Sequence, residues 1–199
     1  MKFILGKKIK MTQVFDKDQN TIIPVTLIKA GPCYVTQIKK QENGKDGYDA
    51  IQLGFEELKK RKIKKPQKSK PYKFLREYRC KDSEHKVGQK IDVSIFKQDE
   101  EVIISGISKG KGFAGVVKRW GFSDRAKAHG HKDMRKVGST GSRFPQRVIK
   151  GKKMPGRMGS ERVTVKNLKI IKIDIENNLM AIKGAMPGNR GTLIEIRSK

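Results

Sequence analysis

The densest set of side chains suited to chemistry lies between Gly106 and Arg162, where basic residues alternate with glycine. This segment contains 16 Lys or Arg residues but only three acids, and it holds 11 of the chain's 20 glycines. Ammonium and guanidinium groups bind phosphate through charge-assisted hydrogen bonds, and glycine lets the main chain approach a ligand closely. The segment therefore predicts binding to a polyanion.

The same segment has too few apolar residues to form a core of its own, and its positive charges repel one another. We expect it to take a fixed shape only against a large, negatively charged partner, for which folded RNA is the best candidate. His129 and His131 resemble a metal-binding pair, but no third ligand is evident nearby, so RNA contact is the favoured interpretation. The residues predicted to bind RNA are Lys7, Lys8, Lys109, Lys111, Lys118, Arg119, His129, His131, Arg135, Arg143, Phe144, Arg147, Lys150, Lys152, Lys153, Arg157 and Arg162.

A glycine pattern in this segment has a competing interpretation. Residues 110–115 read GKGFAG and match the GxGxxG signature of nucleotide-binding loops. The dinucleotide-binding fold needs a second parallel strand, and residues 121–141 contain no apolar run that would form one. Residues 151–156 have the glycine spacing of a phosphate-binding loop, but Arg157 and Met158 replace the Lys-Ser/Thr that must follow. We therefore expect no cofactor, and tight packing explains the glycines better.

Overall composition supports a polyanionic partner. The chain has 199 residues, a formal charge of +27 and a pI of about 10.2, an excess that destabilises a compact protein by self-repulsion. No apolar run approaches the roughly 18 residues of a membrane span, and Phe3–Leu5 is too short for a signal peptide. We expect cytosolic synthesis. Cys33 and Cys80 lack a CxxC spacing and are expected to stay reduced, without metal.

The elements that must position these residues are mainly strands. Alternating apolar residues between turn clusters predict strands in residues 1–55, 87–107 and 163–199, whose apolar faces would close one barrel. Residues 57–86 form a basic insert, and Pro66 and Pro71 argue against a continuous helix there. Residues 121–158 form a long extended loop.

One short helix is predicted within the basic segment, over residues 113–120. Phe113, Val116, Val117 and Trp120 share a face at helical spacing, which favours core positions for Phe113 and Trp120. Phe144 lies between Arg143 and Pro145 in a loop and is the better candidate for stacking on an unpaired base.

Six runs spread over the chain form a distinctive combination of motifs. They are residues 4–15 (ILGKKIKMTQVF), 30–33 (AGPC), 47–55 (GYDAIQLGF), 106–113 (GISKGKGF), 150–159 (KGKKMPGRMG) and 183–188 (KGAMPG). With these runs the whole chain resembles the large-subunit ribosomal protein uL3 family, of bacterial or organellar type. In residues 134–141, MRKVGSTG departs from the family's usual His-Arg-x-Pro-Gly-Ser-Ile-Gly, and Lys10 stands where the family usually has Gly.

The resemblance implies a closed six-stranded barrel of the translation-protein type, with a small α+β insert and an extension that reaches toward the peptidyl-transferase centre. It also implies a non-catalytic protein of the cytoplasmic ribosome, or of an organellar one, that binds the 3′ part of 23S-type rRNA early in assembly. Implied protein neighbours belong to the L14 and L19 families. A general nucleic-acid architectural protein is the alternative, and an enzyme is a distant third.

Overall fold

The computed structural model describes residues 2–16, 20–41, 46–80, 85–130 and 132–199. The chain forms two compact units. The first unit combines Met1–Ile107 with Arg162–Lys199, and the second unit is the intervening segment Ser108–Glu161. The two units differ in how they can be stabilised. Almost all of the buried apolar residues belong to the first unit.

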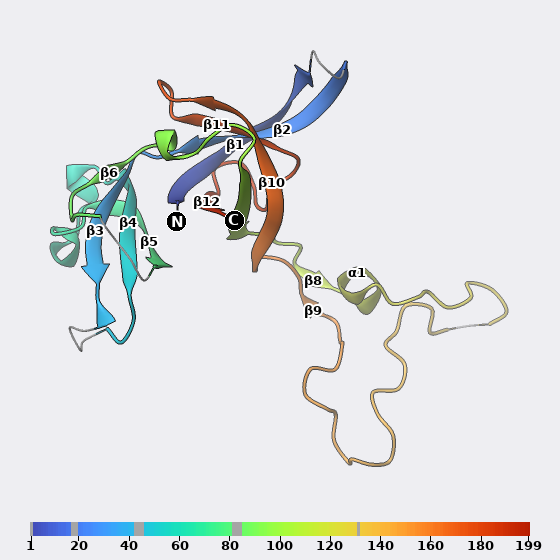
Figure 1. Cartoon of the computed structure of the whole chain (residues 1–199). Helices are drawn as coiled ribbons and strands as arrows, with labels where there is room; N and C mark the ends of the chain where they lie inside the picture. The colour runs from blue at the N-terminus through green and yellow to red at the C-terminus, as the bar shows by residue number, and fades with distance from the viewer. Residues whose placement is uncertain (1, 17–19, 42–45, 81–84, 131) are drawn as a thin grey trace. The chain divides into compact units, whose positions relative to one another are not determined.

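Six strands of the first unit form a sheet that closes on itself, which we call the six-stranded sheet (Figure 1). Its order is β1-β12-β7-β10-β11-β2, and β2 pairs back with β1, all pairs being antiparallel. The prediction of a mainly β protein is confirmed. The strands are β1 (Phe3–Asp16), β2 (Thr21–Ala30), β7 (Glu101–Ile107), β10 (Arg162–Asp174), β11 (Leu179–Lys183) and β12 (Leu193–Ser198).

A second sheet of the first unit has four strands in the order β5-β4-β3-β6. Parts of residues 1–55 and 87–107 therefore belong to this sheet, since β3 pairs with β4 and β6, and β4 also pairs with β5. The strands are β3 (Cys33–Lys39), β4 (Ala50–Glu57), β5 (Tyr72–Arg79) and β6 (Lys90–Ile91).

The basic insert contains two single 3₁₀ turns before β5, η2 (Lys60–Lys62) and η3 (Lys65–Gln67). The described part of residues 57–86 has no α-helix, so the helical part of the implied α+β insert is not found there. A third 3₁₀ turn, η4 (Val93–Ile95), replaces most of the strand expected at residues 91–96. Proline explains why the insert forms no continuous helix, because it removes a main-chain donor and restricts the conformation of the residue before it.

The two sheets share one hydrophobic core. Alternation along each strand sends one set of side chains inward, as in β12, where Ile194 and Ile196 are fully buried while Glu195 is only half-buried. β3 and β4 contribute Val35 and Leu53 to the same cluster. The two sheets therefore stabilise each other, and neither has a separate core.

Close packing also fixes some small residues. A Cβ on Gly6 would lie 2.7 Å from Cγ2 of Ile28 and 3.0 Å from the carbonyl oxygen of Lys29, so β1 requires glycine there. Cys33 is fully buried, and burial raises the pKa of its thiol to about 12. Cys33 and Cys80 are both free thiols.

The shared core predicts a sharp contrast between two isoleucines in strands. Ile104→Ala should lower the free energy of unfolding by roughly 2–5 kcal/mol, because Ile104 is fully buried and its removal leaves a cavity. Ile22→Ala is the matched control, since Ile22 is 59% exposed and its truncation should change stability by less than about 0.5 kcal/mol. Urea unfolding followed by circular dichroism measures both; equal effects would contradict the assigned core.

Candidate nucleic-acid interface

The second unit begins and ends in a two-stranded neck. β8 (Phe113–Ala114) pairs with β9 (Gly156–Arg157), and further main-chain hydrogen bonds extend the pairing. Ser108 N–H donates to the carbonyl of Glu161 at 2.9 Å, and Lys111 N–H donates to that of Met158 at 2.9 Å. This neck carries the only regular strands among the described residues of the unit.

Glycines allow the two sides of the neck to approach closely. A Cβ on Gly159 would collide with the carbonyl oxygen of Lys109, and one on Gly110 would lie 2.9 Å from Oγ of Ser160. β7, the strand before the GxGxxG pattern, is antiparallel to both of its neighbours, so the parallel unit of a dinucleotide-binding fold is absent from the described structure. Close packing against the Ser160 side chain accounts for Gly110. A Cβ on Gly112 or Gly115 would meet no atom of the described residues within 4 Å, apart from its chain neighbours, so close packing does not explain these two glycines.

The helix that follows is shorter than predicted: α1 spans Val116–Trp120 and ends at Gly121, whose φ of 71° lies in the left-handed region. Phe113 belongs to β8 and is 80% exposed, so its predicted core position is wrong. Trp120, also predicted as core, is 42% exposed. Only Val116 of the helix is buried, because the unit has too few apolar residues to cover more.

Two donors from α1 meet at one carbonyl oxygen. The Arg119 guanidinium and the Trp120 indole N–H each donate to the carbonyl of Met154 at 2.9 Å. Arg119 and Lys153 also lie 4.9 Å and 5.8 Å from the Trp120 ring centre. These contacts hold the indole in a positively charged setting. Sequence reasoning missed Met154, because every residue has a carbonyl and no pattern marks the one that is used.

A cavity of about 270 Å³ adjoins this helix within the second unit. Lys109, Lys111 and Arg119 line it together with the Trp120 ring. Three cations beside a half-exposed indole suit a nucleotide, because the cations attract phosphate and the ring offers a stacking face.

The described residues between α1 and β9 form no helix or strand. Two local ion pairs occur there: Asp124 accepts two hydrogen bonds from Arg135, at 3.0 and 3.2 Å, and Asp133 pairs with Lys136 at 2.6 Å. The hydrogen bond from Lys136 lowers the pKa of Asp133. These pairs use two acids and two cations, which leaves most of the basic side chains without an acidic partner.

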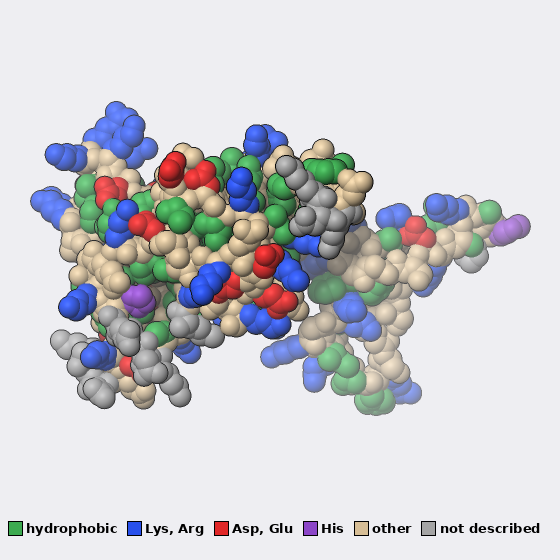
Figure 2. Space-filling view, turned by 45° about the horizontal axis from the view of Figure 1, so that its top comes forward, with side chains coloured by type: hydrophobic (Ala, Val, Ile, Leu, Met, Phe, Trp, Pro, Cys, Tyr) green, Lys and Arg blue, Asp and Glu red, His purple; other side chains and the backbone are tan. Residues whose placement is uncertain are grey.

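The predicted RNA-binding residues of the second unit are accessible. Figure 2 shows Lys and Arg side chains spread along it. Arg119 is half-buried, and His131 lies outside the described residues. The exposed ones are Lys109, Lys111, Lys118, His129, Arg135, Arg143, Phe144, Arg147, Lys150, Lys152, Lys153 and Arg157.

Three predicted residues lie in the first unit and have other partners. Lys8 is only 7% exposed, and its ammonium donates to the carbonyls of Met186 at 2.7 Å and Gly188 at 3.1 Å. Lys8 therefore anchors a loop, and its contact with RNA stays a prediction. Lys7 pairs with Glu56 at 2.9 Å, and Arg162 pairs with Glu195.

A β unit joined to a cationic unit without a core of its own is typical of proteins that bind a polyanion. Among the described residues, no helix is long and apolar enough to cross a bilayer, and no cluster of His, Cys, Asp or Glu suits a metal ion.

Comparison with known proteins identifies the family within this class. The family model "Ribosomal protein L3" matches residues 83–179. The large ribosomal subunit protein uL3 of Petrotoga mobilis is 51% identical over 99% of this chain and 95% of its own length. Those of Thermosipho africanus and Carboxydothermus hydrogenoformans are each 51% identical, over 100% and 98% of this chain and 98% and 96% of their own lengths. The chain belongs to the ribosomal protein uL3 family.

Substitution of the buried Lys8 and of the exposed Lys111 should distinguish a role in folding from a role in RNA binding. Lys8→Ala should lower the free energy of unfolding by roughly 1–3 kcal/mol, because two carbonyls lose their donor. The RNA affinity of the remaining folded protein should stay the same. Lys111→Ala is the matched variant. It should weaken RNA binding and leave the free energy of unfolding unchanged, because Lys111 is exposed beside the Trp120 cavity. Thermal unfolding and filter binding measure the two effects, and a loss of affinity in folded Lys8→Ala protein would return Lys8 to the interface.

Proposed function

We propose that this protein is a non-catalytic structural component of the large ribosomal subunit and binds 23S-type rRNA near its 3′ part. The observation that carries the proposal is the second unit, which exposes basic side chains over residues 108–161 and has no core of its own. Family membership supports ribosomal RNA as the polyanion, since the similar proteins are named as large-subunit proteins.

Binding works by charge neutralisation and close main-chain approach. The neck presents Lys109 and Lys111 beside Trp120, so phosphate contact and base stacking are available at one place. Further along, Arg143 lies 5.8 Å from the Phe144 ring centre, and Phe144 is 69% exposed. This pair suits an unpaired base whose phosphate meets the guanidinium.

We further propose where the protein lies in the large subunit. The six-stranded sheet serves as a translation-protein-type barrel on the subunit surface, and residues 121–158 reach inward toward the peptidyl-transferase centre. The protein joins the subunit early in assembly, in the cytoplasm, beside proteins of the L14 and L19 families. No cofactor or catalytic residue takes part. The long motif resemblance over the whole chain supports these details.

A general nucleic-acid architectural protein is the second candidate, because exposed lysines neutralise any polyanion. A competition assay separates the two functions. At raised salt, an rRNA fragment from the 3′ region should bind at least about tenfold more tightly than duplex DNA of equal length, since ribosomal RNA offers shape and unpaired bases. Equal affinities would favour the architectural protein.

The same assay tests the second unit by the salt dependence of binding. A triple variant, Lys150→Gln, Lys152→Gln and Lys153→Gln, should reduce the slope of log K against log salt by up to about 2–3, because each neutralised phosphate contributes about 0.7–0.9. The charge-retaining control is Lys150→Arg, Lys152→Arg and Lys153→Arg, which should keep most of the slope. An unchanged slope in the neutral variant would remove these lysines from the interface.

Amide hydrogen exchange tests whether the partner orders the extension. In the free protein, amides of residues 121–158 should exchange rapidly, because the described residues there make few main-chain hydrogen bonds. In complex with rRNA the same amides should become protected. The strands β7 and β12 provide the internal control, since they should be protected in both states. Strong protection of residues 121–158 without RNA would contradict folding on the partner.

A further inference from the structure

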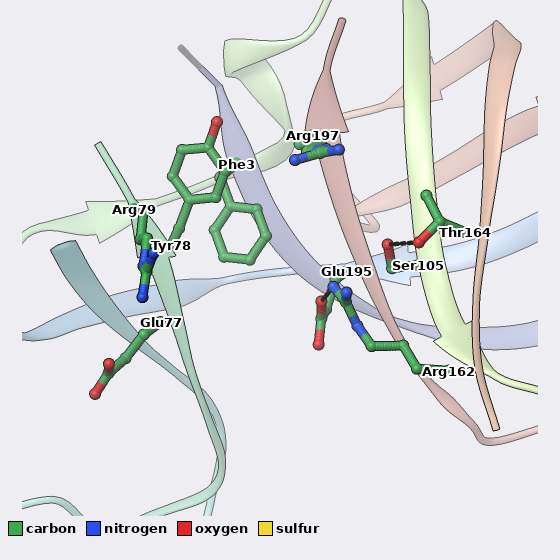
Figure 3. Close-up of a pocket in the computed structure, with 9 residues that line it drawn as sticks. All are labelled: Phe3, Glu77, Tyr78, Arg79, Ser105, Arg162, Thr164, Glu195 and Arg197. Carbon is green, nitrogen blue, oxygen red and sulfur yellow. Dashed lines mark hydrogen bonds and ion pairs between the residues drawn. The ribbon is translucent and has the colours of Figure 1, made fainter. Parts of the chain in front are cut away.

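A second cavity, of about 390 Å³, lies within the first unit (Figure 3). Tyr78 and Arg79 of β5 line one side, together with Phe3 of β1. Across the cleft, β12 contributes Glu195 and Arg197, while Ser105 of β7 and Thr164 of β10 lie beside them. β5 is the edge strand of its sheet, so the cleft runs along an unpaired edge.

The two acids of the cleft are already engaged. One carboxylate oxygen of Glu195 pairs with Arg76 at 3.1 Å, and the other pairs with Arg162. Glu77 accepts a hydrogen bond from the Tyr48 hydroxyl at 2.7 Å and pairs with Lys39 at 3.0 Å. The Tyr48 hydroxyl, followed by Lys39, lowers the pKa of Glu77. Neither carboxylate is available to the remaining arginines.

Arg197 and Arg79 are those remaining arginines. The Nε–H of Arg197 is buried and has no acceptor among the described residues. Arg79 lies 4.9 Å from the Tyr48 ring centre, and neither arginine forms an ion pair with a described carboxylate. A buried donor without a partner is unfavourable, and an external acceptor that reaches this N–H would satisfy it.

The rest of the lining fits an oxyanion that carries an organic group. Hydroxyls of Ser105 and Thr164 lie 2.8 Å apart, and either can turn a proton outward. Phe3 and Tyr78 stack at 4.7 Å and 13°, which makes a rigid aromatic wall. A volume of about 390 Å³ exceeds what a lone anion needs and is in the range of small-molecule sites.

We propose that this cleft binds one phosphodiester group of a single RNA nucleotide, with Arg197 on the phosphate and the nucleoside against the aromatic wall. Guanidinium groups pair well with phosphate oxygens, and the charge of +27 favours a polyanion over a protein carboxylate. The inference rests on the proposed function in that the nucleotide is RNA. It adds a binding site on the first unit, apart from residues 108–161.

Nuclear magnetic resonance of arginine Nε–Hε groups in the full-length protein tests the site directly. Titration with a short oligouridylate should shift the Arg197 and Arg79 signals in a saturable way, and dimethyl phosphate should shift them more weakly. Acetate at equal ionic strength should leave them in place. Arg197→Lys assigns the Arg197 signal, because its Nε–Hε resonance disappears.

The two proposals fail separately in this experiment. Arg143 and Arg147 report on the second unit, so their signals show whether RNA binds at all. If they move while Arg197 and Arg79 stay still, the cleft is not a phosphate site and the proposed function stands. If acetate shifts Arg197 as much as dimethyl phosphate does, the cleft takes carboxylates and the phosphodiester proposal is overturned.

Two variants should change the affinity of the cleft for oligouridylate in opposite directions. Arg197→Gln should weaken oligouridylate binding at the cleft about tenfold, as observed through the Arg79 signal. Glu195→Gln should tighten it, because it removes a negative charge from the cleft and releases Arg76 and Arg162. The matched control is Arg190→Gln, which removes one exposed positive charge outside the lining and should change cleft affinity less than twofold. Weaker binding in Glu195→Gln protein with an unchanged thermal midpoint would contradict the site.

Discussion

Repulsion among 47 basic side chains, opposed by only 20 acids, is the constraint on which the rest of this structure depends. A chain with that excess has two ways to remain folded: it can concentrate its apolar residues in one place, or it can recruit external negative charge. The first unit uses the first way, since two sheets share a single core. The second unit has no comparable core, which is why we propose that rRNA supplies its negative charge.

The scarce acids lie where they hold distant parts of the chain together. Glu56 joins Lys7 of β1 to Lys73 of β5, and both lysines lower the pKa of its carboxyl against the opposing effect of burial. Glu195 joins β5 to β10 in the same manner, through Arg76 and Arg162. Partly exposed pairs of this kind contribute modestly to stability. Their larger effect is to decide which cations lack an acidic partner, and these cations are the ones that we propose to bind RNA.

Sequence patterns predicted what local chemistry determines. Apolar runs predicted strands within residues 87–107 and 163–199, where β7 and β12 lie. The sheet that each strand joins was not predictable, because the sequences of β3 and β4 alternate like those of the barrel strands. Burial of Lys8 and exposure of Phe113 both run against residue type, and long-range contacts alone decide them. The Arg197 cleft had no signal either, since its walls come from strands far apart in sequence.

The register of β7 and β10 has a consequence for how such proteins diverge. Ile107 pairs directly with Arg162, so the sheet is complete on either side of the intervening 54-residue insertion, 108–161. Lengthening, shortening or resequencing that insertion leaves every hydrogen bond of the sheet in place. The insertion can therefore vary in length and sequence without changing the register of β7 and β10. The neck glycines lie at the boundary between the constant and the variable part.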